Sequence, residues 1–551
     1  MPGTRRAPFR VGVGEARCVR RRTAWIRPFA VAAVVALLGA LMGTPAAVAA
    51  DDPHLTRFYQ QRLAWEPCPQ NMGAGTQSPD VTPPPGHQER LECARMEVPR
   101  DYTAPGNRTL QVQLIRLRAT GPGKRLGSLV LNPGGPGASG VNYLIASGSA
   151  FARLGQQYDI VSFDPRGTGH TEPVSCGDKL APPPGNPSDD TLAAKEKRIN
   201  DACGRYSGGL LEWVGTPDVA RDMDVLRAAV HDDKLNYLGF SYGTKLGAVY
   251  AHEFPDKVGR MVLDSVEDPT KNNWQTALAQ ARGFQRALDD FADDCIHATD
   301  CPLGTDGRHA QDQLRTWYQQ LSERPMKVNG QTVDETTYVY ALREALYSRS
   351  DWPALRQALA QLRRGDGSGI LRMSNSGGSR AGLPHRAPAR TAGHPAGGQR
   401  TPARQTGQDD LPSQDQLALR AISCRDTSER YGAGDYPRAE RELTRASPLF
   451  GPDIAPTLLD CYDWPVAGDD ASRDVSAPGA PPMLLVATTN DPATPYEGAA
   501  HMARALGNGS TVLTYRGEGH AAYTTGDPCV QGHVDDFLLN GALPKPGTTC
   551  G

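Results

Sequence analysis

The pentapeptide Gly239–Gly243, of the form G-x-S-x-G, constrains the fold of this chain more than any other segment. A short β-favouring run precedes it at 234–238, and residues 244–251 have the spacing of small and apolar residues typical of a helix. A serine placed between a strand and a helix stands on a tight turn, and its two glycine neighbours let the strand and the helix approach closely. We predict that Ser241 is a nucleophile lifted out of this turn, although a turn serine without chemistry fits these five residues equally well.

Strand and helix patterns alternate on both sides of this turn. Strands are expected at 110–115, 128–132, 159–163, 259–264, 483–487 and 511–515, and helices at 219–230, 244–251 and 530–539. Such alternation is typical of a mostly parallel sheet with helices on both faces. The stretch 269–425 is instead mainly helical, most clearly at 277–291 and 338–362. We predict that it forms a lid inserted between core strands, over the carboxyl ends where such sheets bind ligands.

The first fifty residues have the pattern of an export signal. Arg20–Arg22 precede an uncharged run from Phe29 to Met42 and the small residues Ala47–Ala50. The run is short for a bilayer span, so we expect a secreted protein, cleaved near Ala49 or Ala50, without a stable membrane anchor. General secretion and twin-arginine export both fit. We divide the chain into the signal (1–50), an N-terminal core part (51–268), the lid (269–425) and a C-terminal core part (426–551).

Ten cysteines remain once Cys18 leaves with the signal, and an even number in an exported protein indicates disulfides. They fall into neighbouring couples, and we expect the bridges Cys68–Cys93, Cys176–Cys203, Cys295–Cys301, Cys424–Cys461 and Cys529–Cys550. No C-x-x-C pair or cluster of His and Cys occurs, so we expect no metal and no other cofactor. The chain beyond the signal carries a net charge of about −9, which argues against nucleic acid as a partner.

Residues 374–408 fit neither the strand pattern nor the helix pattern. They are rich in Gly, Ala, Pro, Arg and Ser, contain no Asp or Glu, and hold one large aliphatic residue, Leu383. Such a composition does not form a packed element. A flexible loop and a locally altered reading frame in the gene both account for it.

The partners that a serine nucleophile needs occur at other strand ends. The turn Asn132–Gly137 follows a strand and offers backbone N–H groups for an oxyanion, with Gly135 as one donor and the N–H of Tyr242 as the second. Asp491 follows a strand and is the predicted acid, although an Asx turn or a helix cap there is the alternative. His520 follows the last strand in a Gly-rich turn and is the predicted base, with a surface histidine as the alternative.

The chain order Ser, Asp, His is that of α/β-hydrolases, which defines the expected fold class. Several blocks together resemble the secreted tripeptidyl aminopeptidases of actinomycetes, within the proline iminopeptidase-like α/β-hydrolases. These blocks are Asn132–Gly137, Phe163–Gly169, Arg221–Asp224, Leu238–Thr244, Arg260–Asp264, Asp491–Pro495 and Gly519–His520. The resemblance spans about 65–550 and implies a serine exopeptidase that removes short peptides, often tripeptides, from free N-termini. Residues 374–408 depart from the lid of this family.

An aminopeptidase also needs a carboxylate for the ammonium group of its substrate, and Glu267, Asp268 and Glu497 are candidates, each also interpretable as a surface acid. Arg166 is interpreted as structural, paired inside the fold. We expect peptide or protein N-termini as substrates and a monomeric enzyme. An esterase or lipase of the same fold is the alternative function, and a non-catalytic binding protein is a third.

Overall fold

A ten-stranded sheet forms the centre of the computed structural model, which describes residues 53–70, 72–73, 88–178, 180, 191–376 and 411–551. In spatial order its strands are β1 (Glu66–Pro67), β2 (Leu91–Pro99), β3 (Thr109–Leu117), β5 (Tyr158–Phe163), β4 (Gly127–Asn132), β6 (Leu235–Phe240), β7 (Val258–Asp264), β10 (Leu484–Asn490), β11 (Thr511–Glu518) and β12 (Thr549–Cys550). The pairs from β5 to β12 are parallel, and β1, β2 and β3 join as antiparallel strands. The expected mostly parallel α/β sheet is confirmed.

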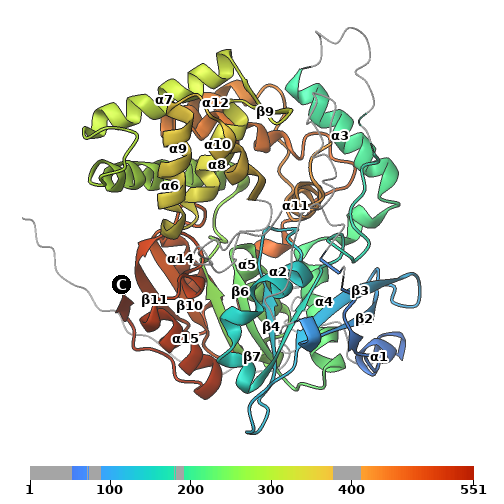
Figure 1. The fold of residues 1–551 in the computed structure, drawn as a ribbon. Coiled ribbons are helices and arrows are strands. Elements are labelled where there is room, and N and C mark those ends of the chain that lie inside the picture. The colour runs from blue at the N-terminus through green and yellow to red at the C-terminus, as the bar shows by residue number, and fades with distance from the viewer. Residues whose placement is uncertain (1–52, 71, 74–87, 179, 181–190, 377–410) are drawn as a thin grey trace, which may run out of the picture. The chain divides into compact units, whose positions relative to one another are not determined.

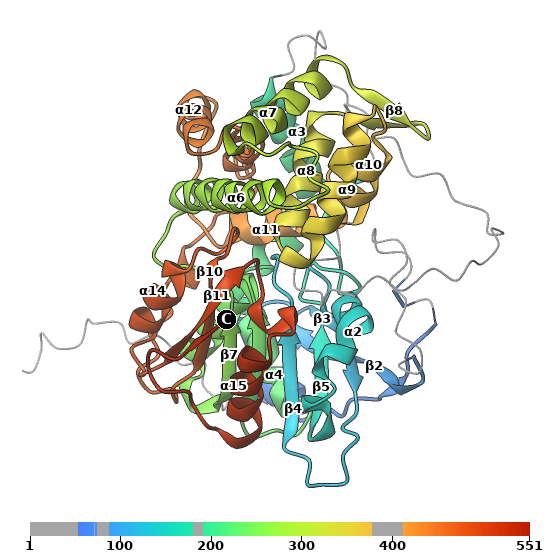
Figure 2. The ribbon, with the colours of Figure 1, turned by 60° about the vertical axis from the view of Figure 1, so that its left-hand side comes forward.

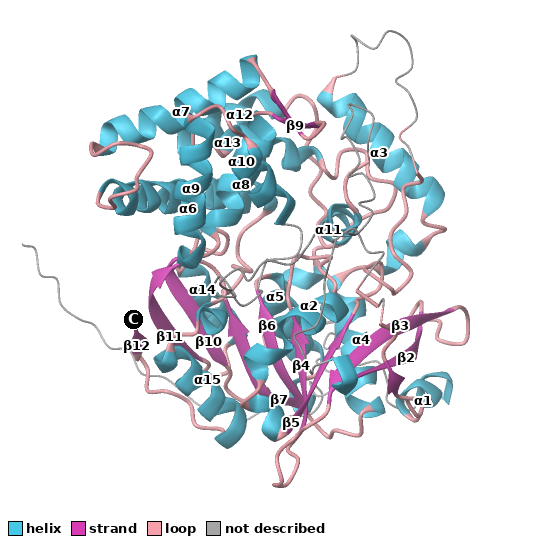
Figure 3. Cartoon of the chain, in the orientation of Figure 1, coloured by secondary structure: helices cyan, strands magenta, loops and turns pink. Residues whose placement is uncertain are grey.

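Successive side chains of the central strands enter two different hydrophobic cores, as the two-residue period of a strand requires. Val130 of β4 packs in one core and its neighbours Leu129 and Leu131 in the other; Leu485 and Val486 of β10 divide in the same way. The first core holds α4 (Thr216–Ala229), α5 (Tyr242–Glu253) and α14 (Glu497–Leu506), and the second holds α2 (Gly140–Ser147) and α15 (Pro528–Asn540). Helices therefore cover both faces of the sheet (Figure 3).

A mainly helical region follows β7 and lies above the strand ends in Figures 1 and 2. It contains α6 (Asn273–Ile296), α7 (Gly307–Glu323), the hairpin β8 (Met326–Val328) and β9 (Gln331–Val333), α8 (Glu335–Leu346), α9 (Trp352–Arg363), α10 (Ser368–Ser376), α12 (Tyr436–Ala446) and α13 (Gly451–Ile454). These elements share a hydrophobic core of their own, to which Phe291, Leu342 and Leu443 contribute. The predicted helical insertion is therefore present. The helices α12 and α13, which follow residue 425, pack in the same core. The domain boundary at 425 stays a prediction.

The helical segment expected over 338–362 is divided into two helices. The structure ends α8 at Leu346 and starts α9 at Trp352, with Pro353 in the first turn of the new helix. Proline lacks the backbone N–H of a helix interior and clashes with the preceding turn, but it is favourable at a helix start. The proline in the sequence was the signal for this break.

Three further helices contribute side chains to the first core: α1 (Pro53–Tyr59), α3 (Leu192–Tyr206) and α11 (Gln414–Arg425). All five expected disulfides are confirmed, and Cys424–Cys461 ties α11 to the chain after α13. The predicted signal at 1–50 and most of 374–408 lie outside the described residues. Within the described ranges, none of the helices has the length and apolarity needed to cross a membrane.

Candidate active site

Ser241 occupies the sharp turn between β6 and α5. Its backbone angles are φ 56° and ψ −126°, a left-handed conformation that an ordinary residue adopts only under strain. A Cβ atom on Gly239 would lie 2.5 Å from the carbonyl oxygen of Gly243, and one on Gly243 would lie 2.8 Å from the carbonyl oxygen of Asn132. Both glycines of the pentapeptide are therefore required for the close approach of strand and helix around the serine, as the sequence predicted.

His520 and Asp491 lie together at the ends of β11 and β10. The Nδ1 atom of His520 is 2.9 Å from each carboxylate oxygen of Asp491, and both side chains are buried. The Oδ1 atom of Asp491 also accepts the backbone N–H groups of Ala493 and Thr494 at 2.9 Å. Asp491 thus forms the Asx turn that was the alternative interpretation, and the same turn aims its carboxylate at the histidine.

The charge state of His520 depends on this carboxylate. Burial disfavours the charged imidazolium, but the negative charge of Asp491, its hydrogen bond and the charge of Asp264 outweigh burial and raise the pKa of His520 above its ordinary value. With Nδ1 donating its proton to Asp491, the Nε2 atom of the neutral ring is an acceptor. Within the described ranges, no hydrogen bond joins the Ser241 hydroxyl to His520.

Asp264, at the end of β7, links the serine turn to the histidine loop. Its carbonyl oxygen accepts the N–H of Ser241 at 3.0 Å, and its carboxylate accepts the N–H groups of Ala522 and Tyr523 at 3.1 and 2.8 Å. The side chain is fully buried. Sequence reasoning noted Asp264 within a family block but gave it no role, and only its position after a strand next to the serine strand could have indicated one.

Two other residues that sequence reasoning missed contact His520. The hydroxyl of Thr494 donates to Oδ2 of Asp491 at 3.0 Å and lies 3.3 Å from Nδ1 of His520. From the lid, the carbonyl oxygen of Tyr347 accepts the N–H of His520 at 2.9 Å, and the two rings meet edge to face with centroids 5.4 Å apart. The lid is therefore attached directly to the histidine loop. The position of Thr494, three residues after the acid in a turn sequence, was its available signal.

The predicted oxyanion donors flank the serine. Gly135 and Tyr242 both line the cavity that contains Ser241. The N–H of Gly134 is already bonded to Oδ1 of Asn132, whereas no described residue accepts the N–H of Gly135 or of Tyr242. Tyr242 is also the first residue of α5, where the backbone dipoles favour negative charge.

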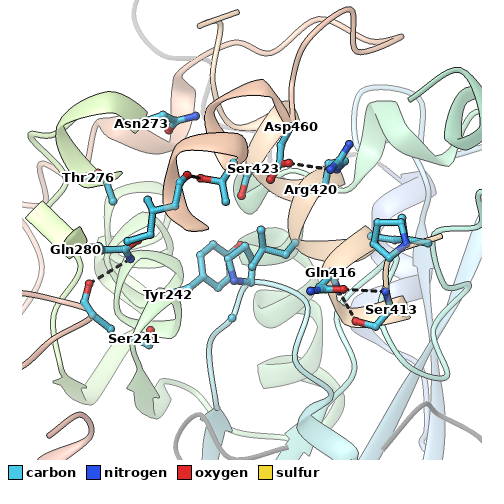
Figure 4. A pocket seen from close by; sticks show the side chains of 18 of the residues that line it. Ser241, Tyr242, Asn273, Thr276, Gln280, Ser413, Gln416, Arg420, Ser423 and Asp460 are labelled. Carbon is cyan, nitrogen blue, oxygen red and sulfur yellow. Dashed lines mark hydrogen bonds and ion pairs between the residues drawn. The ribbon is translucent and has the colours of Figure 1, made fainter. Parts of the chain in front are cut away.

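A cavity of about 1970 Å³ opens above Ser241, between the strand ends and the helical lid (Figure 4). Core residues such as Ser241, Tyr242 and Thr494 form its floor, and Gln280 of α6 and Arg420 of α11 belong to its walls. Its volume exceeds the range of about 300–1,000 Å³ that is usual for small-molecule pockets. The cavity has room for an extended substrate next to the serine.

The three acids that the sequence offered for the substrate ammonium group differ in their position relative to the cavity. Glu267 and Asp268 line this cavity, whereas Glu497 is exposed and lies outside it. Arg166 forms two hydrogen bonds with the buried carboxylate of Asp222, at 2.5 and 2.7 Å, which confirms its structural interpretation.

Within the described ranges, one cluster has the spacing of metal ligands: Cys529, His533 and Cys550. Its two cysteines are bonded to each other, and a disulfide offers no thiolate to a metal.

Comparison with curated proteins finds relatives along most of the chain. The chain is 32% identical over 512 residues to the protein named serine protease Hip1 of Mycobacterium tuberculosis, covering 89% of this chain and 91% of that protein. It is 32% identical over 478 residues to the tripeptidyl aminopeptidase of Streptomyces coelicolor, covering 84% and 83%. It is 33% identical over 482 residues to the carboxylesterase B of Mycobacterium tuberculosis, covering 83% and 86%.

A family model and solved structures also match. Residues 447–550 match the family model described as TAP-like protein. Among solved structures, the serine hydrolase CCSP0084 from Cycloclasticus zankles is 10% identical with a TM-score of 0.34, covering 81% of this chain and 98% of that one.

Proposed function

The chain belongs to the tripeptidyl aminopeptidase family of α/β-hydrolases and is a serine hydrolase of the peptidase type, and from this premise we propose that it releases short peptides, tripeptides foremost, from free N-termini outside the cell. The observation that carries the proposal is the buried pair of His520 and Asp491, joined at 2.9 Å and placed after β11 and β10 of the sheet whose strand β6 leads into the strained turn of Ser241. A hydrolase that attacks through serine needs a base for the hydroxyl proton and a carboxylate that orients the base.

We propose the following roles for these residues. Ser241 Oγ attacks the scissile carbonyl while Nε2 of His520 takes the hydroxyl proton, and Asp491 holds Nδ1–H so that Nε2 faces the serine. The N–H groups of Gly135 and Tyr242 receive the negative charge that develops on the carbonyl oxygen, a contribution that is typically about 3 kcal/mol for each donor. His520 then gives its proton to the leaving amine, and water releases the acyl group from Ser241 by the same route in reverse.

The proposal of an extracellular enzyme rests on the export pattern at 1–50 and on the five disulfides, which persist in oxidising compartments. We also propose that the enzyme is a monomer. Sedimentation of the purified protein tests the monomer, and its N-terminal sequence after export tests cleavage near Ala49 or Ala50.

Hydrolysis of three reporters tests the proposed activity: a tripeptide amide with a free amino group, the same tripeptide amide after N-acetylation, and a short acyl ester. We expect kcat/KM to be highest for the free tripeptide amide and to fall on acetylation. Equal turnover of the free and acetylated amides would refute the aminopeptidase.

An esterase is the second candidate, because one relative carries the name carboxylesterase B and because fold and triad do not choose between amide and ester bonds. Rapid turnover of the ester with no cleavage of either amide would favour it. A non-catalytic protein of this fold would turn over none of the three reporters.

A further inference from the structure

The cavity above Ser241 is lined by six acidic side chains, and most of them already bond a cation. Glu196 and Asp460 both pair with Arg420, at 2.6 and 2.7 Å. Asp426 pairs with Lys245 at 3.2 Å, and Asp268 pairs with both Lys271 and His501. The two other acids of the cavity are Asp178 and Glu267.

Of the two acids without a bonded cation among the described residues, Asp178 is exposed to solvent and Glu267 is half-buried. In the part of the chain that the structure describes, the carboxylate of Glu267 has no hydrogen bond and no ion pair. Glu267 is therefore the acid inside this cavity that no described cation engages.

The backbone holds Glu267 close to the serine turn. Its N–H donates to Oγ1 of Thr244 at 2.9 Å, and the same hydroxyl donates to the carbonyl oxygen of Ser241 at 2.6 Å. One threonine side chain thus joins the two backbones. Two residues earlier, the N–H of Ser265 donates to the carbonyl oxygen of Val486 in the neighbouring strand at 2.9 Å, which fixes the start of this loop.

The charges that act on Glu267 come from one lysine and two acids. Burial raises the pKa of Glu267; the positive charge of Lys245 opposes this, and the charges of Asp426 and Asp268 add to it. Lys245 is itself bonded to Asp426 at 3.2 Å, and Lys271 is bonded to Asp268. A cation that enters the cavity beside Glu267 would relieve the repulsion among these carboxylates.

We infer that the carboxylate of Glu267 receives the α-ammonium group of the peptide substrate and selects for a free N-terminus. The inference rests on the proposed aminopeptidase function and names the residue that enforces it. Among the three acids that the sequence offered for this task, Asp268 is occupied by Lys271 and His501, and Glu497 lies on the surface outside the cavity. A charge-assisted hydrogen bond in a partly desolvated site discriminates strongly against a blocked amine.

The test compares wild type with Glu267→Gln, which keeps the shape of the side chain and removes its charge, and with Glu497→Gln as the matched surface control. For the free tripeptide amide we expect Glu267→Gln to lower kcat/KM by about 10- to 100-fold, mainly through a higher KM. For the acetylated amide and the acyl ester, neither of which carries an ammonium group, we expect wild-type values. Labelling by a fluorophosphonate should proceed at the wild-type rate, and Glu497→Gln should match wild type throughout.

Three outcomes would overturn the inference. An equal loss on all three reporters, together with slower labelling, would mean that Glu267 only supports the fold of the site. An unchanged preference for the free amine in Glu267→Gln would place the ammonium group elsewhere. If wild type itself fails to distinguish free from acetylated peptide while its serine still labels, the aminopeptidase proposal fails and the anchor fails with it.

Discussion

Replacing Asp264 by asparagine tests how the structure couples the serine turn to the histidine loop. Asparagine has nearly the same shape but only one acceptor oxygen for the two N–H groups, of Ala522 and Tyr523, that the carboxylate now accepts. The lost hydrogen bond costs about 1–3 kcal/mol where the wild-type carboxylate is ionised. The substitution also removes a negative charge that acts on His520.

The pH dependence of this effect follows from the pKa of Asp264. Burial raises it from 3.8 to about 6, against the opposing hydrogen bonds from Tyr523 and Ala522 and the charge of His520. The unfolded chain releases the proton near pH 3.8 and the folded protein near pH 6. The associated stability is therefore complete below the lower value and is lost as the pH rises through the higher one, by about 3 kcal/mol.

Urea unfolding of wild type and Asp264→Asn, with disulfides intact, measures this loss as a difference between the two proteins. Because asparagine does not titrate, we expect the unfolding free energy of the variant relative to wild type to rise by about 3 kcal/mol between about pH 4 and pH 7. We also expect the acid limb of its kcat/KM profile to move to lower pH, because His520 loses a charge that raises its pKa. A difference in stability that is independent of pH, or an acid limb that moves to higher pH, would refute this reasoning.

Two further substitutions probe the geometry of the site, both with the free tripeptide amide as reporter. Thr494→Val removes the hydroxyl that bonds Asp491 and lies 3.3 Å from His520, so we expect kcat/KM to fall by about 3- to 10-fold; an unchanged rate would show that this hydroxyl does not orient the pair. Gly134→Ala places a Cβ atom 2.9 Å from that of Ser241 and 2.5 Å from a backbone carbonyl oxygen, at φ +95°, and we expect a loss of at least about 100-fold with little change in expression. Wild-type activity of this variant would contradict the tight fit of the oxyanion turn against the serine.

The parts of the structure that the sequence could predict depend on local patterns. The turn around Ser241 needs only a strand, two glycines and a helix in succession, and these lie within one short stretch. The disulfides join cysteines separated by 6 to 37 positions, so pairing neighbours was sufficient. The break between α8 and α9 was equally local, since Pro353 marks it, and it could have been predicted.

The parts that could not be predicted depend on contacts between distant residues. Asp264 bonds the N–H of Tyr523 across 259 positions, and nothing in either local sequence indicates that contact. The same holds for Tyr347, whose carbonyl oxygen fixes the histidine loop from within the lid. Glu267 could be nominated from the sequence, but only the packing separates it from the engaged Asp268. Which acid remains free is a property of the assembled cavity.

Fluorophosphonate labelling followed by peptide mapping tests the central claim most directly, because the reagent reacts with an activated serine. We expect one adduct on wild type, located at Ser241, and none on Ser241→Ala, whose kcat/KM for the tripeptide amide should be lower by about 10⁴-fold or more. An adduct on another serine, or a Ser241→Ala variant that still labels and cleaves like wild type, would contradict the account.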